Sequence, residues 1–359
     1  MIDRSWRPRL LPSVDVPPAA DDEEPARPWL LSLWLVTVVF VAIGVWRSEV
    51  VGIWFRDPKG NLLRDKFLAT LMLLVVLIVV DALWRGLRTP GLGVLSALRR
   101  RWTWRRVGLT LVALVGYHLI YFTYRNLKSW DVFNAPRDRD LTALDQWLFF
   151  GHSPAVLLHD LLGQGLADHI LVPWYESFAT MNSIALLAFV AFNSRLRDGM
   201  VAVAALAWAW ILGVGSYYLV PSLGPFQDRP QDFAGLPRSI VTQTQALYMD
   251  QRATLLAHPS AHDSFAQISA FASLHIGITA LILMMLRYHR LRGLSYVMGV
   301  YLLGTIVATI YLGWHFAVDD VAGLLIAWAS VWLGQLTIYW RGARTGSRSD
   351  RPAETYVAG

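Results

Sequence analysis

The sequence has no cysteine among its 359 residues and only three lysines, Lys59, Lys66 and Lys128. Without cysteine the chain can form neither a disulfide nor a thiolate metal site, and the redox compartment cannot be inferred. Charged residues are also scarce. They make up 16% of the chain against 55% hydrophobic residues, which is too apolar for an ordinary soluble domain of this length. The composition therefore predicts a polytopic membrane protein.

The net charge of +6 comes mainly from arginines in short stretches between apolar runs. Residues 85–106 contain seven arginines and no acidic residue, and Asp81 just before them is interpreted as an interfacial carboxylate next to Arg85. Between two membrane spans, such a stretch is typical of a cytoplasmic loop lying against anionic lipid. We therefore expect membrane lipids and no nucleic acid among the partners. The oligomeric state stays open.

Apolar segments recur along the chain and are separated by polar or arginine-rich stretches. Most approach the length that a helix needs to cross the bilayer core. Together with the arginine-rich loops, they predict an all-α, polytopic transmembrane helical bundle of about eight spans with both termini inside. The predicted spans cover residues 29–46, 67–84, 107–124, 174–192, 199–220, 276–286, 294–312 and 315–340.

These spans divide the chain into four parts. Residues 1–27 and 341–359 read as cytoplasmic tails, the first of them disordered because it is rich in proline and acidic residues. Residues 28–106 form an N-terminal transmembrane hairpin and its basic loop, and residues 107–340 form a transmembrane core. Within that core, residues 221–265 are expected to be a long polar loop on the outer side, acting as a lid or substrate-selecting loop.

Two histidines stand out because two membrane crossings separate them. His275 lies in Ala-Ser-Leu-His-Ile-Gly and His315 in Gly-Trp-His-Phe-Ala-Val-Asp-Asp, so both fall on the same, outer side of the membrane. Asp319 follows His315 by four residues and shares its helix face, whereas Asp320 points elsewhere, and Asp320→Asn should be mild. Ser273 is a good N-cap candidate just before His275.

Such an arrangement suits phosphoryl transfer by a histidine nucleophile. The nucleophile needs a neutral ring held in one tautomer by a carboxylate, and the leaving oxygen needs a proton donor. His315, Asp319 and His275 can take these three roles in that order. Isolated histidines at membrane helix ends usually have only packing or interfacial roles, but paired ionisable groups inside a membrane mark functional sites.

Phosphate also needs cationic or hydrogen-bonding partners. Ser273, Arg125, Lys128 and Arg229 are the substrate-binding candidates on the same side as the histidines, and Arg238 and Arg252 are secondary ones. No cofactor is expected. A metal site at His258, His262 and Asp263 is disfavoured because histidines in polar loops are usually solvated.

At these residues the sequence resembles the type 2 phosphatidic acid phosphatase superfamily. Ser273-Leu274-His275 is similar to its second motif in the inositol phosphorylceramide synthase branch, and His315 and Asp319 match the His-x-x-x-Asp of its third. The resemblance implies that His315 is the nucleophile, that Asp319 orients it and that His275 is the acid and base. The sequence departs from the family where Ala272 replaces a proline and Thr309 an arginine. The first motif is missing, since Arg229-Pro230 has Ser222 where the lysine would be.

The leading hypothesis is thus an enzyme that transfers or removes a phosphoryl group on a lipid at the outer face of a plasma membrane. The few lysines lead us to expect a bacterial membrane. A synthase-like second motif favours transfer of a phospho-head group such as inositol phosphate. A simple lipid-phosphate phosphatase is the alternative within this class. A transporter or a catalytically inactive scaffold is the alternative outside it, but a transporter would spread its charges through the membrane depth.

Overall fold

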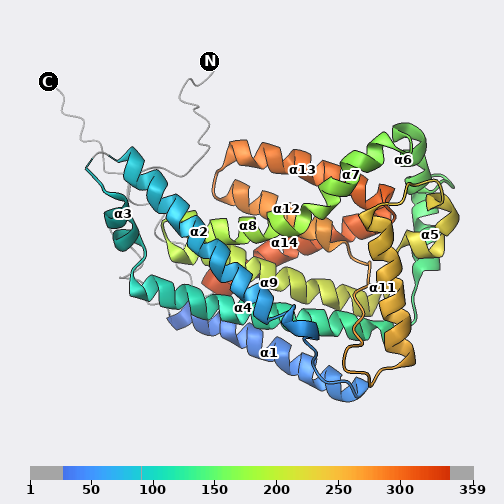
Figure 1. Cartoon of the computed structure of the whole chain (residues 1–359), viewed down its shortest axis with the longest axis horizontal. Coiled ribbons are helices and arrows are strands. Elements are labelled where there is room, and N and C mark those ends of the chain that lie inside the picture. Colours follow the sequence, from blue (N-terminus) through green and yellow to red (C-terminus); the bar gives the residue numbers. More distant parts are fainter. Residues whose placement is uncertain (1–26, 90, 340–359) are drawn as a thin grey trace, which may run out of the picture.

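The computed structural model describes residues 27–89 and 91–339, which form one elongated bundle of helices (Figure 1). The two predicted tails lie almost wholly outside these residues. The long helices are α1 (Arg27–Val51), α2 (Arg64–Arg88), α4 (Trp104–Trp130), α8 (Phe178–Phe192), α9 (Leu196–Leu219), α11 (Ile240–Ala257), α12 (Leu274–Tyr288), α13 (Arg292–Tyr311) and α14 (Ala317–Tyr339). The shorter ones are α3 (Val94–Arg101), α5 (Asp138–Leu148), α6 (Pro154–Leu162), α7 (Leu166–Glu176) and α10 (Pro225–Asp228).

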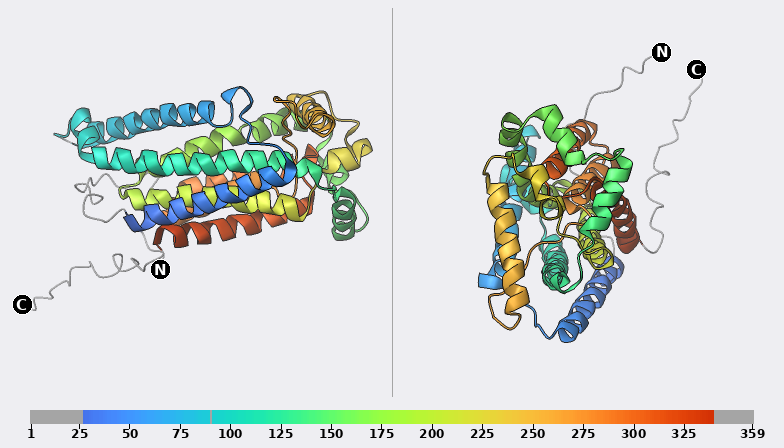
Figure 2. Two further views of the ribbon diagram at one scale, coloured as in Figure 1. Left: turned by 90° about the horizontal axis from the view of Figure 1, so that it is seen from below. Right: turned by 90° about the vertical axis from the view of Figure 1, so that its right-hand side faces the viewer.

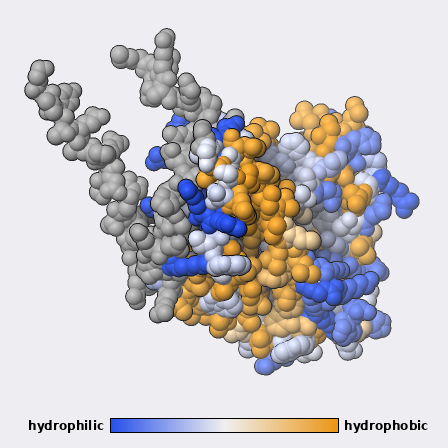
Figure 3. All heavy atoms as spheres, turned by 60° about the vertical axis from the view of Figure 1, so that its left-hand side comes forward, coloured by the Kyte–Doolittle hydropathy of each residue, from blue (hydrophilic) through white to orange (hydrophobic). Residues whose placement is uncertain are grey.

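The predicted all-α membrane bundle is confirmed. Within the described residues, seven helical segments are long and apolar enough to cross a membrane, and Figure 3 shows an apolar band between hydrophilic regions. The remaining predicted span is α12, whose 15 residues extend only about 22 Å at 1.5 Å per residue. Because this is shorter than a bilayer core, α12 depends on its neighbours for burial.

Helix α9 is the centre of the bundle. Its apolar stretch is 72% buried, whereas that of α2 is only 17% buried. Five alanines between residues 202 and 209 keep the surface of α9 smooth, and a Cβ added at Gly334 of α14 would lie 2.7 Å from the backbone of Ala205. Small residues allow such close packing where lipid offers no hydrophobic driving force. The large apolar side chains of α1, α2 and α13 therefore face outward, toward lipid.

The two ends of the bundle differ in content. Helix α3 and the connections from α8 to α9 and from α12 to α13 lie at one end, on the left in Figure 1. At the other end lie α5, α6 and α11, and α11 crosses the bundle axis (Figures 1 and 2). The arginine-rich loops and the histidine motifs are thus at opposite ends, as the predicted alternation requires.

The basic loop is only partly as predicted. Arg99, Arg100 and Arg105 are exposed, but Arg101 and Arg106 are buried. Asp81 is also buried, 2.9 Å from Arg85 Nε and 2.7 Å from Arg101 Nε. Asp81 thus lies next to Arg85 as predicted, but it is buried between two arginines and not open to the membrane surface, and the interpretation of the whole loop as lipid-facing is wrong.

These buried arginines close the C-terminal end of α8. Arg101 donates to the carbonyl oxygens of Ala191 and Asn193, and Arg106 donates to those of Asn193 and Ser194. The last carbonyls of a helix lack intrahelical partners and carry partial negative charge, so cations stabilise them. The reason sequence patterning missed these contacts is that donor and acceptor are about 90 residues apart.

The segment from residue 221 to 265 is not the irregular loop that its composition suggested. It contains the 18-residue helix α11, which begins with a capping box. Ser239 accepts a bond from the Thr242 N–H, and the Ser239 N–H donates to the Thr242 hydroxyl. Gln245 then anchors α11 by donating to the Leu312 carbonyl at 2.9 Å.

Candidate active site

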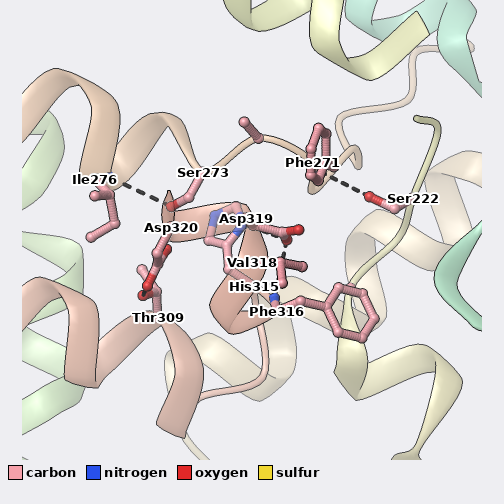
Figure 4. Close-up of polar contacts among 12 residues, drawn as sticks. Ser222, Phe271, Ser273, Ile276, Thr309, His315, Phe316, Val318, Asp319 and Asp320 are labelled. Atoms are coloured by element: carbon pink, nitrogen blue, oxygen red, sulfur yellow. Dashed lines mark hydrogen bonds and ion pairs between the residues drawn. The ribbon is translucent and has the colours of Figure 1, made fainter. Parts of the chain in front are cut away.

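The extended segment before α12 positions His275. Side chains of two long helices satisfy its backbone: the Ala266 N–H donates to Ser129 of α4, and the Ala272 N–H to Ser216 of α9 at 2.9 Å. The bond at Ala272 is one that proline could not make, which gives the departure at this position a structural role. The Ser222 hydroxyl accepts from the Phe271 N–H at 2.8 Å (Figure 4).

Helix α12 then begins at Leu274, with Ser273 as its N-cap. The Ser273 hydroxyl accepts from the Ile276 N–H, and the Ser273 N–H donates to the Asp319 carbonyl of α14 at 3.0 Å. Ser273 is fully buried. It therefore connects the starts of two helices, and it does not line the cavity beside the two histidines, so its role as a substrate-binding residue stays a prediction.

The turn before α14 positions His315. Gly313 has φ +77°, a conformation that glycine adopts without strain, and the N–H groups of Trp314 and His315 both donate to the Thr309 carbonyl. Helix α14 then receives a cap from another element. Asp145 of α5 accepts from the N–H groups of Ala317 at 2.8 Å and Val318 at 3.1 Å.

Asp145 was not among the predicted site residues, and nothing in the local sequence links it to His315. Burial raises the pKa of its carboxyl group, and the two backbone donors oppose that rise. Asp138 lies two turns earlier on the same face of α5. Its carboxylate holds the neighbouring loop by accepting from the N–H groups of Leu223 and Gly224 at 2.8 Å each. Helix α5 thus fixes two backbone segments around His315.

Three predicted residues come together where α12 and α14 begin. His315 Nδ1 lies 3.4 Å from Asp319 Oδ2, and the ring centres of His275 and His315 are 5.7 Å apart. Asp319 Oδ2 also accepts from the Phe316 N–H at 3.0 Å (Figure 4). The His–Asp contact is longer than an ideal hydrogen bond, as is common in catalytic sites without a bound substrate.

Burial keeps the His315 ring neutral. It holds the pKa of the imidazole well below its usual range, and the nearby His275 and Lys128 lower that pKa further. At neutral pH the ring therefore keeps one free lone pair. If Nδ1 carries the proton and donates to Asp319, the free lone pair is on Nε2.

Both histidines line a cavity of about 300 Å³, which we call the inner cavity. Its aromatic wall includes Tyr175, whose ring stacks on His275 with 4.4 Å between ring centres, and Phe178 at the same distance. Both aromatic residues come from the break between α7 and α8. Pro173, which lacks an N–H, lies just before that break, so the predicted single span 174–192 is two helices.

Two predicted cations of α4, Arg125 and Lys128, also line the inner cavity. Arg125 donates to the Tyr121 hydroxyl at 3.1 Å and to Gln267, whereas Lys128 Nζ lies 5.1 Å from the centre of the Tyr217 ring. They lie one turn apart, so both can face the same phosphate. The cavity therefore combines a neutral imidazole with two cations.

Arg229 is placed differently. It is ion-paired with Asp232 at 2.9 Å and lines a separate space of about 20 Å³ beside His315, large enough for little more than one water molecule. The prediction of Arg229 as a phosphate ligand is therefore not supported by its position. Of the secondary candidates, Arg238 is exposed and Arg252 half-buried. Neither lines the inner cavity.

Asp320 does point away from His315, but it is not a bystander. Its Oδ2 accepts from the Thr309 hydroxyl at 3.1 Å, and its carboxylate lies near Ser273 in the bundle interior (Figure 4). Thr309 itself is fully buried and faces Asp320, at the position where the family resemblance implies an arginine. The mild effect of Asp320→Asn stays a prediction.

The polar loop that follows α11 does not gather metal ligands. His262 and Asp263 are 3.5 Å apart and almost fully exposed. Across residues 27–89 and 91–339, no group of three histidine, aspartate or glutamate side chains is arranged to hold a metal ion.

One family model matches this sequence. The sequence model of the PAP2 superfamily matches residues 139–333, more than half of the chain. That region includes His275, His315 and Asp319, but it begins after Arg125 and Lys128. No match was found among curated proteins or solved structures.

The cap on α14 can be tested by substitution. Asp145→Ala should lower the free energy of unfolding by about 1–2 kcal/mol, because two N–H groups lose their acceptor. Thermal unfolding in detergent measures the change. Asp140→Ala is the matched control, since Asp140 is on the same helix in an exposed pair with Arg137 and should shift stability little. Equal effects of the two substitutions would contradict the assigned cap.

Proposed function

The chain belongs to the PAP2 superfamily and is thus a phosphatase or phosphotransferase of lipid phosphates, and on that premise we propose that it acts through a phosphohistidine formed on His315. The observation that carries this proposal is the meeting of His315, Asp319 and His275 beside a cavity with two cations. The site lies at one end of the bundle. This position suits a substrate whose polar head group enters the cavity while its tail stays in lipid.

In the first step, Nε2 of His315 attacks the phosphorus atom, and the bond between phosphorus and the leaving oxygen breaks. The negative charge of the bound phosphate favours the protonated form of the His275 ring, which burial alone disfavours. His275 then donates its proton to the leaving oxygen, while Asp319 stabilises the positive charge on the His315 ring. In the second step, an acceptor hydroxyl gives its proton to His275 and attacks phosphorus. The P–N bond breaks and both rings return to their starting states.

Charge stabilisation would come from Arg125 and Lys128. Oriented cations in a cavity sheltered from water stabilise the transferring phosphoryl group far more than they would in solvent. Both are on α4, so they would replace cations that the relatives carry in motifs missing from this chain. Tyr121 and Gln267 hold the Arg125 guanidinium ready for this role.

Transfer is favoured over hydrolysis by the Ser-Leu-His motif at 273–275, which is similar to that of inositol phosphorylceramide synthases. On this reading a phospho-head group such as inositol phosphate moves to or from a lipid. A phosphatase acting on phosphatidate or a polyprenyl phosphate uses the same first step, with water as the acceptor.

A transporter is disfavoured because the site's ionisable groups gather at one end of the bundle. An ion path needs such groups through the membrane depth. A catalytically inactive scaffold would not need a histidine held neutral beside two cations.

Substitutions at His315, Asp319 and His275 test their three proposed roles separately. His315→Ala should abolish the acid-labile, protein-bound phosphate seen after rapid quenching of purified protein with labelled lipid phosphate. Asp319→Asn should reduce turnover by about 10³–10⁴-fold, because the amide favours the wrong tautomer and cannot stabilise a charged ring. His275→Ala should impair lipid phosphates strongly and aryl phosphates little, since an aryl oxygen leaves without a proton.

Labelled phosphate on His315→Ala would contradict the assignment of the nucleophile. Equal losses with lipid and aryl phosphates would remove His275 as the acid.

The cation pair gives a second test. Lys128→Met should lower kcat by about 10²-fold or more, as expected when a charge aimed at the transition state is lost. Arg229→Met is the comparison, since its side chain is ion-paired outside the inner cavity and should leave turnover nearly unchanged. The reverse order of effects would assign the phosphate contact to Arg229.

The site's side of the membrane is testable because the chain has no cysteine. We propose that the histidine end faces outward, since arginine-rich loops lie at the other end. Ala246→Cys on α11 should react with a membrane-impermeant maleimide in intact cells, and Leu95→Cys on α3 should react only after lysis. Labelling of residue 95 in intact cells would place the site in the cytoplasm.

A further inference from the structure

A second, larger cavity lies next to the inner one. It measures about 470 Å³, and we call it the outer cavity. The connection from α1 to α2, helices α4 and α11, and the segment before α12 form its walls. The lining residues used below are Lys66, Arg125, Asp250, Thr254, Ser264 and Gln267.

The two cavities share a wall. Arg125 and Gln267 line both of them, and their side chains are hydrogen-bonded to each other. Gln267 also donates to Gln251 on the outer side at 3.2 Å. This hydrogen-bonded pair of side chains therefore lies where the two cavities meet.

Hydrogen bonds between distant segments of the chain hold the walls of the outer cavity in place. Arg56 in the connection from α1 to α2 donates to the carbonyl oxygens of Pro259 and Ser264 at 2.6 and 2.5 Å. Its backbone exchanges two bonds with the Asn126 side chain of α4 at 2.8 and 3.1 Å. Residues 58–66 and Arg125 all precede the region matched by the superfamily. The outer cavity thus combines residues that precede the matched region with residues between 250 and 267 that lie inside it.

The lining chemistry limits the occupant. The lining carries two basic residues, Lys66 and Arg125, and two acidic ones, Asp250 and Asp263, together with amide and hydroxyl groups, and Lys66, Asp250 and Asp263 are exposed. An acyl chain would desolvate these charges without compensation, and an anion would meet two carboxylates. A neutral molecule with many hydroxyl groups can bond to every one of these donors and acceptors.

A second observation points to such a ligand. The Ser264 hydroxyl is buried and lacks a hydrogen-bond partner among the described residues, although Ser264 lines this cavity. Buried polar atoms are almost always bonded, so an unpaired one beside a cavity indicates a missing partner.

We propose that the outer cavity binds a neutral polyhydroxylated acceptor, a sugar or cyclitol, and that the Arg125–Gln267 pair is the passage to phosphorylated His315. This inference rests on the proposed function and names its second substrate. The acceptor hydroxyl gives its proton to His275 and its oxygen bonds to phosphorus as the P–N bond breaks. The product is a phosphorylated polyol, and water competes for the same intermediate.

The test measures how the phosphoenzyme divides between water and an added acceptor. Purified protein is given phosphatidate or an aryl phosphate together with glycerol, myo-inositol or glucose. Inorganic phosphate and phosphorylated polyol are then quantified by phosphorus NMR. Their ratio depends only on the second step, so it is independent of how fast the phosphoenzyme forms.

Thr254→Trp fills the outer cavity from α11, and Ala253→Trp places the same side chain on an adjacent exposed position that does not line it. Thr254→Trp should lower the ratio of transfer to hydrolysis by about tenfold or more, because hydroxyl-binding groups lose their ligand. Ala253→Trp should keep the wild-type ratio and the wild-type rate of phosphate release.

Two outcomes overturn the inference while leaving the proposed function intact. One is equal ratios in the two tryptophan variants. The other is wild-type protein that releases phosphate only to water at saturating concentrations of all three polyols. Formation of neither inorganic phosphate nor phosphorylated polyol by the wild type would instead reject the proposed function, and the inference would fall with it.

Discussion

The site depends on one close approach, the contact between the starts of α12 and α14. The Ser273 N–H donates to the Asp319 carbonyl at 3.0 Å, and a Cβ at Gly323 would lie 2.4 Å from the Ser273 carbonyl oxygen. Only glycine leaves room for this contact. Since His275 follows Ser273 by two residues and Asp319 orients His315, the spacing of the two imidazoles follows from this single helix contact. The cap from Asp145 and the bonds from Ser129 and Ser216 hold the two helix starts in place.

The electrostatics of the inner cavity follow from burial. Removing His315 from water disfavours its charged form, and the neighbouring Lys128 acts in the same direction. A lowered imidazole pKa means that the folded chain binds fewer protons than the unfolded chain below the ordinary histidine pKa. His315 thus destabilises the fold as pH falls below about 6.5 and costs nothing above it. A neutral nucleophile beside cations is what phosphoryl transfer requires, so the same burial that limits stability in acid prepares the chemistry.

Some predictions failed because they were based on residue type, which does not reveal which distant group a side chain contacts. Arg101 and Arg106 were assigned to lipid with the rest of their loop, yet they cap α8 from about 90 residues away. For Ser273 and Arg229, phosphate contact stays a prediction, and the structure adds partners that residue type did not reveal: the first closes a helix contact and the second pairs with Asp232. Asp145 was missed for the converse reason. An aspartate in an amphipathic helix carries no local signal that it caps another helix 172 residues later.

The sequence by itself determined the membrane class, the alternation of spans, the opposite ends for arginine-rich loops and histidines, and the His315–Asp319 pair. These depend on hydropathy, charge and helical spacing, which act over a few neighbouring residues. Only the tertiary structure decided that His275 and His315 share a cavity, that Arg125 and Lys128 face it while Arg229 does not, and that a second polar cavity adjoins it. Each of these depends on side chains from distant helices meeting in space, because packing and desolvation depend on which surfaces touch and not on spacing along the chain.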